Sequence, residues 1–317
     1  MVRAGVAGCL AWYGILCLGA AAADAGATTL RERLAGFSAA GHRGSSVRAD
    51  GNTIAGFERA HAAGADIIEM DLRTTSDGVA VVYHDPSIKR STTGCSGVIS
   101  EMTLAEVHTC RVGGQWALPT FEAVLQWADG RVVLNAEFKD HAAIAPAVAL
   151  VNEYQAHEWV YFQCKSDRLR YELARGQDAH VALLFKPATE TDLDWILGVD
   201  DQRLVVIELD DALLRHDVQA RVQAAGKLAS ANAWPRSVFE EVLWDACDLV
   251  YTRGIDIAVS KHPAGCAAAA AAWNAGDGSH ATLWFERGLL AGVPVALVLL
   301  VAGAGWMLLR RRRALPA

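Results

Sequence analysis

The stretch ADIIEMDLRTTSDGVAVVYHDP, Ala65–Pro86, decides how this chain folds. It contains two apolar runs of strand-like length, joined by the turn-forming residues Ser-Asp-Gly at 76–78. Glu69 and Asp71 interrupt the first run, and His84 closes the second. Ionisable groups are costly inside buried strands. We therefore expect these three residues where two strands open to a functional site.

The same alternation of apolar runs with amphipathic stretches continues over residues 36–270 and predicts an α/β fold with a parallel sheet. About eight strand–helix units in this span suit a (β/α)8 TIM barrel. The rival is an open doubly wound sheet, but no G-x-G-x-x-G follows the first strand and no P-loop motif occurs. The predicted strands are 34–42, 65–72, 79–84, 132–138, 159–163, 180–185, 204–209, 227–233 and 248–254. Residues 85–117 lack this periodicity, which indicates a small insertion after the third strand.

Polar residues gather at the carboxyl ends of the early strands, where parallel barrels place their active sites. Side chains two apart in a strand share a face, so such pairs point into one mouth. A single strand-end acid or histidine is more often a cap, an ion pair or a core residue, but here four neighbouring ends are polar. The candidates are His42, Arg43, Glu69, Asp71, His84, Glu137 and Lys139.

The chemistry of these side chains points to phosphodiester cleavage. Three crowded carboxylates, Glu69, Asp71 and Glu137, repel one another unless a cation joins them. An all-oxygen set favours Mg²⁺ or Ca²⁺ over zinc. Arginine and lysine side chains suit a phosphate, and imidazoles exchange protons near neutral pH.

These residues also carry a resemblance to a known family. The segments GHRG, NTIAGFERAHAAGADIIEMDLRTTSDGVAVVYHD, LPTFEAVL and LNAEFK, between Gly41 and Lys139, closely resemble the glycerophosphodiester phosphodiesterase family. The resemblance implies a (β/α)8 barrel with an insertion after the third strand and a divalent cation, Ca²⁺ or Mg²⁺. It implies that Glu69, Asp71 and Glu137 bind the metal, that His42 and His84 are the catalytic acid–base pair, and that Arg43 and Lys139 bind the phosphate.

The chain departs from the family pattern at three places. Asp50-Gly51 replaces the usual Pro-Glu before Asn-Thr, which leaves a supporting carboxylate in question. The late W-T-V-N strand resembles only Ser230–Trp234, and the closing T-D-x-P motif corresponds to Thr252-Arg253 without its acid. The last two departures fall on the side of the alcohol, so they leave its identity open.

Three functions follow as hypotheses. The first is metal-dependent hydrolysis of a glycerophosphodiester to glycerol 3-phosphate and an alcohol, which makes the protein a phosphoric diester hydrolase. The second is a lysophospholipase D or phosphoinositide-type phospholipase on the same barrel, acting on a lipid substrate. The third is an inactive barrel that binds a partner. A net charge of −7 without a basic stripe in the body argues against nucleic acid.

Both ends of the chain predict targeting segments. Residues 1–25 combine Arg3, an apolar run and small residues in the pattern of a signal peptide. After a linker at 271–287, the 22 uncharged residues 288–309 suit a transmembrane helix, and the tail 310–317 begins with four arginines that would stay in the cytoplasm. This layout predicts a membrane-anchored body outside the cytoplasm, periplasmic or at the cell surface.

Cysteine usage fits an oxidising compartment. Five cysteines remain after the predicted signal peptide, none in a C-x-x-C pair. Cys95 and Cys110 are the first candidate disulfide, and Cys247 and Cys266 are a weaker second. An odd number leaves at least one thiol without an intramolecular partner.

Overall fold

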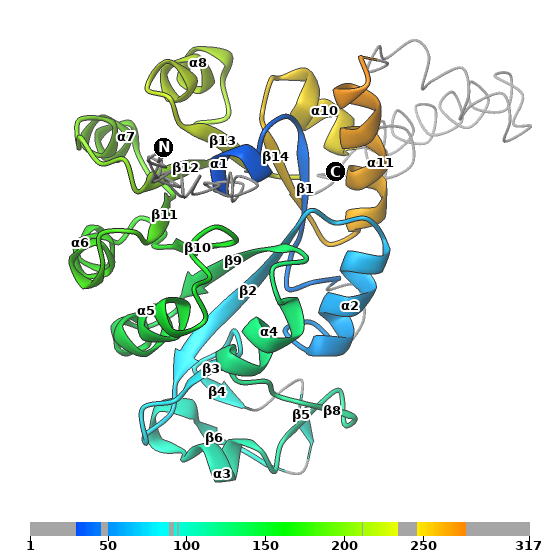
Figure 1. The fold of residues 1–317 in the computed structure, drawn as a ribbon, viewed down its shortest axis with the longest axis vertical. Helices are drawn as coiled ribbons and strands as arrows, with labels where there is room; N and C mark the ends of the chain where they lie inside the picture. Colours follow the sequence, from blue (N-terminus) through cyan, green and yellow to red (C-terminus); the bar gives the residue numbers. More distant parts are fainter. Residues whose placement is uncertain are drawn as a thin grey trace, which may run out of the picture.

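Eight parallel strands form a closed barrel in the computed structural model of the chain (Figure 1). The structure describes residues 30–45, 50–88, 92–93, 95–210, 212–233 and 246–276. Each strand pairs with the next around the ring, and β1 pairs with both β14 and β2, which closes it. The barrel strands are β1 Ser38–Gly41, β2 Ile67–Thr74, β9 Val133–Phe138, β10 Val160–Gln163, β11 Ala182–Phe185, β12 Leu204–Leu209, β13 Leu228–Asn232 and β14 Ile257–Ser260. The expectation of a TIM barrel is confirmed.

The strands carry apolar residues on both faces because each face is covered. Ile67, Val133 and Tyr161 point into the barrel, while their neighbours in sequence pack outward against the helices. The helices are α1 Leu30–Arg33, α2 Ile54–Ala62, α4 Phe121–Ala128, α5 Ile144–Glu153, α6 Arg168–Gln177, α7 Glu190–Leu197, α8 His216–Ala224, α10 Ala246–Thr252 and α11 Pro263–Asn274, with the 3-10 turn η2 His141–Ala143 before α5. Most of them surround the barrel (Figure 1).

The amino end of the barrel is closed by α1. Leu30 and Leu34 pack among the inward-facing strand residues, and Arg31 donates hydrogen bonds to the carbonyls of Gln202, Leu204 and Gly226. The last helix of the described residues, α11, ends at the same side of the barrel, because the Asn274 side chain bonds to both backbone groups of Phe37, just before β1. The polar residues at the carboxyl ends of the strands therefore meet at the opposite end of the barrel.

The predicted strand 79–84 is not part of the barrel, and this expectation was wrong. Its ordered part, β3 Ala80–Val82, pairs antiparallel with the end of β2. The physical reason is the short turn at 76–78, since a hairpin turn can only reverse the chain, whereas a parallel neighbour needs a long crossover. Gly78 has a φ of +83° in this turn. The insertion therefore follows the second barrel strand, and the third is β9.

The insertion has a small core of its own. Its elements are β4 Ser87–Ile88, β5 Thr92–Thr93, β6 Gly97–Val98, the 3-10 turn η1 Ile99–Glu101, α3 Leu104–Val107, β7 Arg111–Val112 and β8 Trp116–Ala117. Ile88, Ile99 and Val107 are buried together in this core. A disulfide joins Cys95 to Cys110 within this unit, and a second joins Cys247 of α10 to Cys266 of α11. Cys164 is buried and makes no disulfide with another cysteine of the described residues.

The predicted strand 248–254 was also wrong, because most of it lies in α10. Cys247, Val250 and Tyr251 are buried at helical spacing, which a short apolar run does not distinguish from a strand. The eighth strand is β14, at Ile257–Ser260, which the sequence analysis did not single out.

The ends of the described chain differ slightly from the expected domain limits. The fold begins with α1, six residues before position 36, and α11 extends to Asn274, so the first residues of the expected linker are helical. The predicted signal peptide 1–25, transmembrane helix 288–309 and tail 310–317 lie outside the described residues. Within the part that the structure does describe, no helix is long and apolar enough to span a membrane.

Candidate active site

The turn after β1 brings His42 and Arg43 to the mouth of the barrel. A Cβ on Gly41 would lie 2.3 Å from the Gly44 carbonyl oxygen, and Gly44 itself has a φ of +80°. Glycine is therefore required at both ends of the GHRG segment. The His42 amide donates to the Ser260 carbonyl at 2.8 Å, which ties this turn to the end of β14.

Three carboxylates meet at the ends of β2 and β9. Asp71 lies opposite Glu137 in the parallel ladder, and Glu69 is two residues earlier on the same face. All three residues are buried, and one oxygen from each lies within 4.8 Å of the others. The structure thus brings together the three acids that the sequence analysis grouped.

Cationic and amide groups hold these carboxylates in place. The Arg43 amide donates to Glu69 Oε2 at 2.8 Å. Asp71 accepts a hydrogen bond from Asn52 Nδ2 at 2.7 Å and forms ion pairs with Arg43 Nε at 3.0 Å and Lys139 Nζ at 2.9 Å. Glu137 Oε1 contacts Lys139 Nζ and lies 3.1 Å from Lys165 Nζ.

This arrangement affects the acids differently. Burial raises the pKa of Glu69 well above its ordinary value, and the charges of Asp71 and Glu137 add to that effect. Burial would also raise the pKa of Asp71, but Lys139 and Arg43 outweigh it and hold this pKa below its ordinary value. Glu69 therefore resists ionisation more than Asp71 does without a further cation.

The donor set fits a hard divalent cation. It consists of carboxylate oxygens only, gathered in a buried space where mutual repulsion disfavours full ionisation. Ca²⁺ and Mg²⁺ prefer such oxygen ligands. Glu69, Asp71 and Glu137 would hold the ion.

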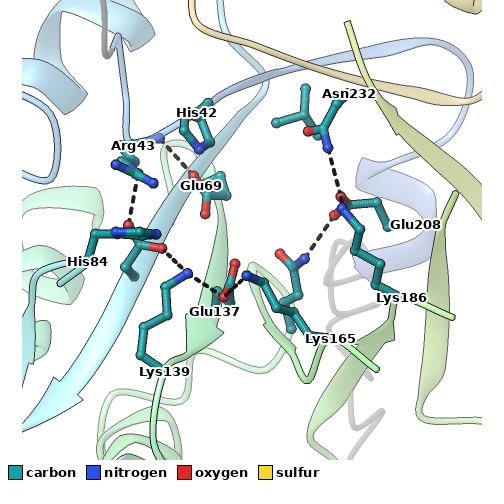
Figure 2. A pocket seen from close by; sticks show the side chains of 13 residues that line it. His42, Arg43, Glu69, His84, Glu137, Lys139, Lys165, Lys186, Glu208 and Asn232 are labelled. Carbon is teal, nitrogen blue, oxygen red and sulfur yellow. Dashed lines mark hydrogen bonds and ion pairs between the residues drawn. The ribbon is translucent and has the colours of Figure 1, made fainter. Parts of the chain in front are cut away.

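The two histidines reach the mouth from different elements (Figure 2). His42 is half-buried after β1, and burial together with Arg43 lowers its pKa to about 3, despite the opposing charge of Asp71. His84 lies after β3, where its Nδ1 is 2.7 Å from Asp85 Oδ1. Arg73 fixes the backbone there by donating from Nε and Nη2 to the His84 carbonyl, at 2.9 and 2.7 Å.

A pocket of about 140 Å³ joins these groups to a second polar wall that the sequence analysis missed. Figure 2 shows this wall facing the carboxylates and histidines. It comes from β10 to β13, and its residues are Gln163, Lys165, Lys186, Glu208 and Asn232. The same rule of polar residues at strand ends would have found Lys186 and Glu208, had it been applied to the later strands.

The three departures from the family pattern also have structural positions. Asp50 is buried in an ion pair with Arg59 of α2 and is not part of the cluster of three acids. Thr252 belongs to α10, so assigning the closing motif to Thr252-Arg253 was wrong. The last strand β14 ends at Ser260 instead, and Lys261 and His262 follow it. Trp234 lies outside the described residues, whereas Asn232 lines the pocket.

Comparison with known proteins agrees with this geometry. Residues 42–188 match the model of the Glycerophosphoryl diester phosphodiesterase family. This part of the chain belongs to that family. It includes all seven site residues predicted from the sequence, from His42 to Lys139.

Curated relatives of this family cover part of the chain. A probable glycerophosphodiester phosphodiesterase 2 of Mycobacterium tuberculosis is 34% identical over 162 residues, which is 50% of this chain and 60% of the relative. A glycerophosphodiester phosphodiesterase of Caldanaerobacter subterraneus is 33% identical over 132 residues, or 38% of this chain and 54% of the relative. The chain thus spans about half the length of these relatives.

Solved structures share the fold. A glycerophosphoryl diester phosphodiesterase from Parabacteroides distasonis superposes with a TM-score of 0.66 at 19% identity, covering 77% of this chain and 92% of that one. An Oleispira antarctica phosphodiesterase, solved in complex with the product sn-glycerol-3-phosphate, gives 0.61 at 21% identity, covering 74% and 96%. At this identity the likeness concerns the barrel alone.

Proposed function

We propose that this protein is a metal-dependent phosphoric diester hydrolase that converts a glycerophosphodiester to glycerol 3-phosphate and an alcohol. The observation that carries the proposal is one pocket whose lining brings together the three clustered acids, the side chains of Arg43 and Lys139, and the two histidines. The family match over residues 42–188 and the named activities of the curated relatives support it. The product bound to the Oleispira antarctica enzyme is of the expected kind.

The residues divide the work of hydrolysis between them. Arg43 and Lys139 bind the phosphate and offset charge that builds up on its oxygens. One of His42 and His84 removes a proton from the nucleophile as its oxygen bonds to phosphorus, and the other protonates the alcohol oxygen as its bond to phosphorus breaks. Ca²⁺ or Mg²⁺ on Glu69, Asp71 and Glu137 would supply Lewis-acid polarisation of the phosphate.

The proposal includes a place outside the cytoplasm. A signal peptide at 1–25 and a membrane span at 288–309 would anchor the barrel to the membrane from outside, periplasmic or at the cell surface. Two disulfides in the described chain are in keeping with an oxidising compartment. Fractionation of cells that produce the full chain tests this, since recovery in the soluble cytoplasmic fraction would contradict it.

The activity is tested on the full chain with several glycerophosphodiesters, with and without a chelator. We expect release of glycerol 3-phosphate that stops with chelator and returns with Ca²⁺ or Mg²⁺. Glu69→Gln and His42→Gln should each lower kcat by roughly 10²–10⁴-fold. The matched controls are Glu122→Gln and His216→Gln, on α4 and α8, which should change kcat little.

The same assay separates the competing hypotheses. Cleavage of lysophosphatidylcholine but of no water-soluble diester would indicate a lysophospholipase D. Absence of metal-dependent cleavage of every substrate, in a protein that unfolds cooperatively, would favour a barrel that only binds a partner.

A further inference from the structure

The second wall of the pocket is built around a single buried carboxylate. Glu208 at the end of β12 accepts hydrogen bonds from Gln163 Nε2 at 2.9 Å, Lys186 Nζ at 2.6 Å and Asn232 Nδ2 at 3.2 Å. Gln163 and Asn232 are the last residues of β10 and β13, and Lys186 directly follows β11. Because Glu208 is buried and already accepts three bonds, its role is to hold its neighbours rather than to receive a ligand.

The groups with unused capacity on this wall are N–H donors. An ammonium carries three N–H groups. Lys165 uses one of them on Glu137 in the described structure, and nearly half of its side chain is exposed. Lys186 uses two, on Glu208 and on Asp210 at 2.7 Å. Lys165 also has a φ of +49°, a left-handed backbone that non-glycine residues adopt rarely and that is enriched at functional sites.

The charge balance of the pocket also favours a further anionic group on the substrate. Apart from the histidines, its lining holds four carboxylates and four permanent cations, so it is electrically balanced when all are ionised. A divalent cation on the three acids would add two positive charges, and the phosphodiester of a substrate would remove one. One positive charge would remain over the lining as a whole, while Asp210, which pairs with Lys186, lies outside this lining.

The lining also disfavours other kinds of alcohol. Among the described residues that line it, Val259 is the only aliphatic side chain and none is Phe, Tyr or Trp. A quaternary ammonium such as choline is usually bound by aromatic rings, and an acyl chain by an apolar surface. The wall offers neither within the described chain.

From these contacts we propose that Lys165 and Lys186 select a substrate whose alcohol carries an oxyanion of its own, a phosphate or a carboxylate. The proposal rests on the proposed function and specifies the substrate class of the same site. Gln163, Asn232 and Glu208 are positioning residues that keep Lys186 at the pocket.

The test compares matched diesters on the full chain with Ca²⁺ or Mg²⁺. Glycerophosphoglycerol is the neutral reference, its phosphorylated form and glycerophosphoglycerate carry the two oxyanions, and glycerophosphocholine carries the opposite charge. We expect kcat/KM for at least one anionic diester to exceed that of the reference by about tenfold, and glycerophosphocholine to fall below it. The anionic diester whose kcat/KM exceeds that of glycerophosphoglycerol by the larger factor shows whether phosphate or carboxylate is preferred.

Lys165 and Lys186 are tested through the ratio of kcat/KM for the preferred anionic diester to kcat/KM for glycerophosphoglycerol. Lys165→Met and Lys186→Met should each reduce it to roughly threefold or less. Lys227→Met, at the amino end of β13, is the matched control and should leave it unchanged, because Lys227 Nζ bonds to the Asp201 carbonyl far from the mouth. Calorimetry on His42→Gln, whose lowered kcat leaves most of the substrate intact during the titration, should show the same preference in Kd. If Lys186→Met does not fold, the Lys165→Met variant still tests the proposal.

Two results would overturn the proposal. One is a neutral or cationic diester cleaved as well as the anionic ones, and the other is a preference that survives both lysine substitutions. Either would leave the hydrolase itself standing, because glycerophosphoglycerol would still be cleaved. A chain that cleaved none of the four diesters would instead refute the proposed function.

Discussion

Asp71 is an aspartate kept ionised in the protein interior by its neighbours. Lys139 and Arg43 contact it, and Asn52 both donates to Oδ2 and accepts from the Asp71 amide at 3.2 Å. Asn52 has a φ of +62°, so glycine at this position keeps the backbone and removes only the amide side chain.

We therefore predict that Asn52→Gly weakens Ca²⁺ or Mg²⁺ binding by roughly 10–100-fold, as is usual when a partner of a metal ligand is removed. Calorimetric titration of the metal-free protein measures this. Asn152→Gly, on an exposed face of α5, is a control for loss of an asparagine, although glycine in a helix lowers stability somewhat. An unchanged metal affinity in Asn52→Gly would show that Lys139 and Arg43 suffice to orient Asp71.

The lowered pKa of His42 predicts how the stability of the folded protein depends on pH. Its pKa is lowered from 6.5 to about 3, chiefly by burial. Between these values the unfolded chain binds a proton that the folded chain does not, so stability falls as the pH drops below 6.5. At pH 5.5 this group alone should lower the free energy of unfolding by about 1.4 kcal/mol relative to pH 8.

Urea denaturation of chelated protein at both pH values measures the effect. His42→Gln should show a correspondingly smaller loss on acidification, while His216→Gln, an exposed histidine on α8, should behave as the unchanged protein does. An equal loss in all three would mean that His42 is accessible to protons in the folded state.

At the scale of elements, the ends of β1, β2 and β9 could be predicted because polar residues interrupt apolar runs there. The identity of β3 could not be predicted from its apolar run, since the choice between a barrel strand and a hairpin depends on the length of the connection. The segment around α10 was ambiguous because strand and helix periods coincide in a short run. Lys186 directly follows β11, so the strand-end rule covers it, whereas Lys165 lies two residues beyond the end of β10 and that rule does not reach it.

The β1 element also makes a prediction. Gly41→Ala places a methyl group 2.3 Å from the Gly44 carbonyl oxygen, where the backbone must shift. We expect a loss of stability of about 3 kcal/mol and a displaced His42, measured by thermal unfolding and by activity. Gly176→Ala in α6 meets nothing within 4 Å and should instead stabilise by about 0.5–1 kcal/mol. Equal effects of the two would contradict a tight β1 turn.

For the whole molecule, the buried acids couple folding to metal binding. An ion that binds only the folded state stabilises it by about 2.7 kcal/mol at a hundred times its Kd. We predict that Ca²⁺ or Mg²⁺ raises the Tm of chelated protein and that Glu69→Gln removes most of this increase. Scanning calorimetry at several ion concentrations measures it. A Tm independent of both ions would contradict a site formed by Glu69, Asp71 and Glu137.

The meeting of α1 and the end of α11 at the amino end of the barrel has a consequence for orientation. Both described ends of the chain leave from the side opposite the pocket, as the bonds of Arg31 and Asn274 show. If residues 288–309 cross a membrane as proposed, the barrel is tethered by its base. A mouth on the side away from such an anchor would face the surrounding solution, which would favour freely diffusing diesters over substrates embedded in the same bilayer.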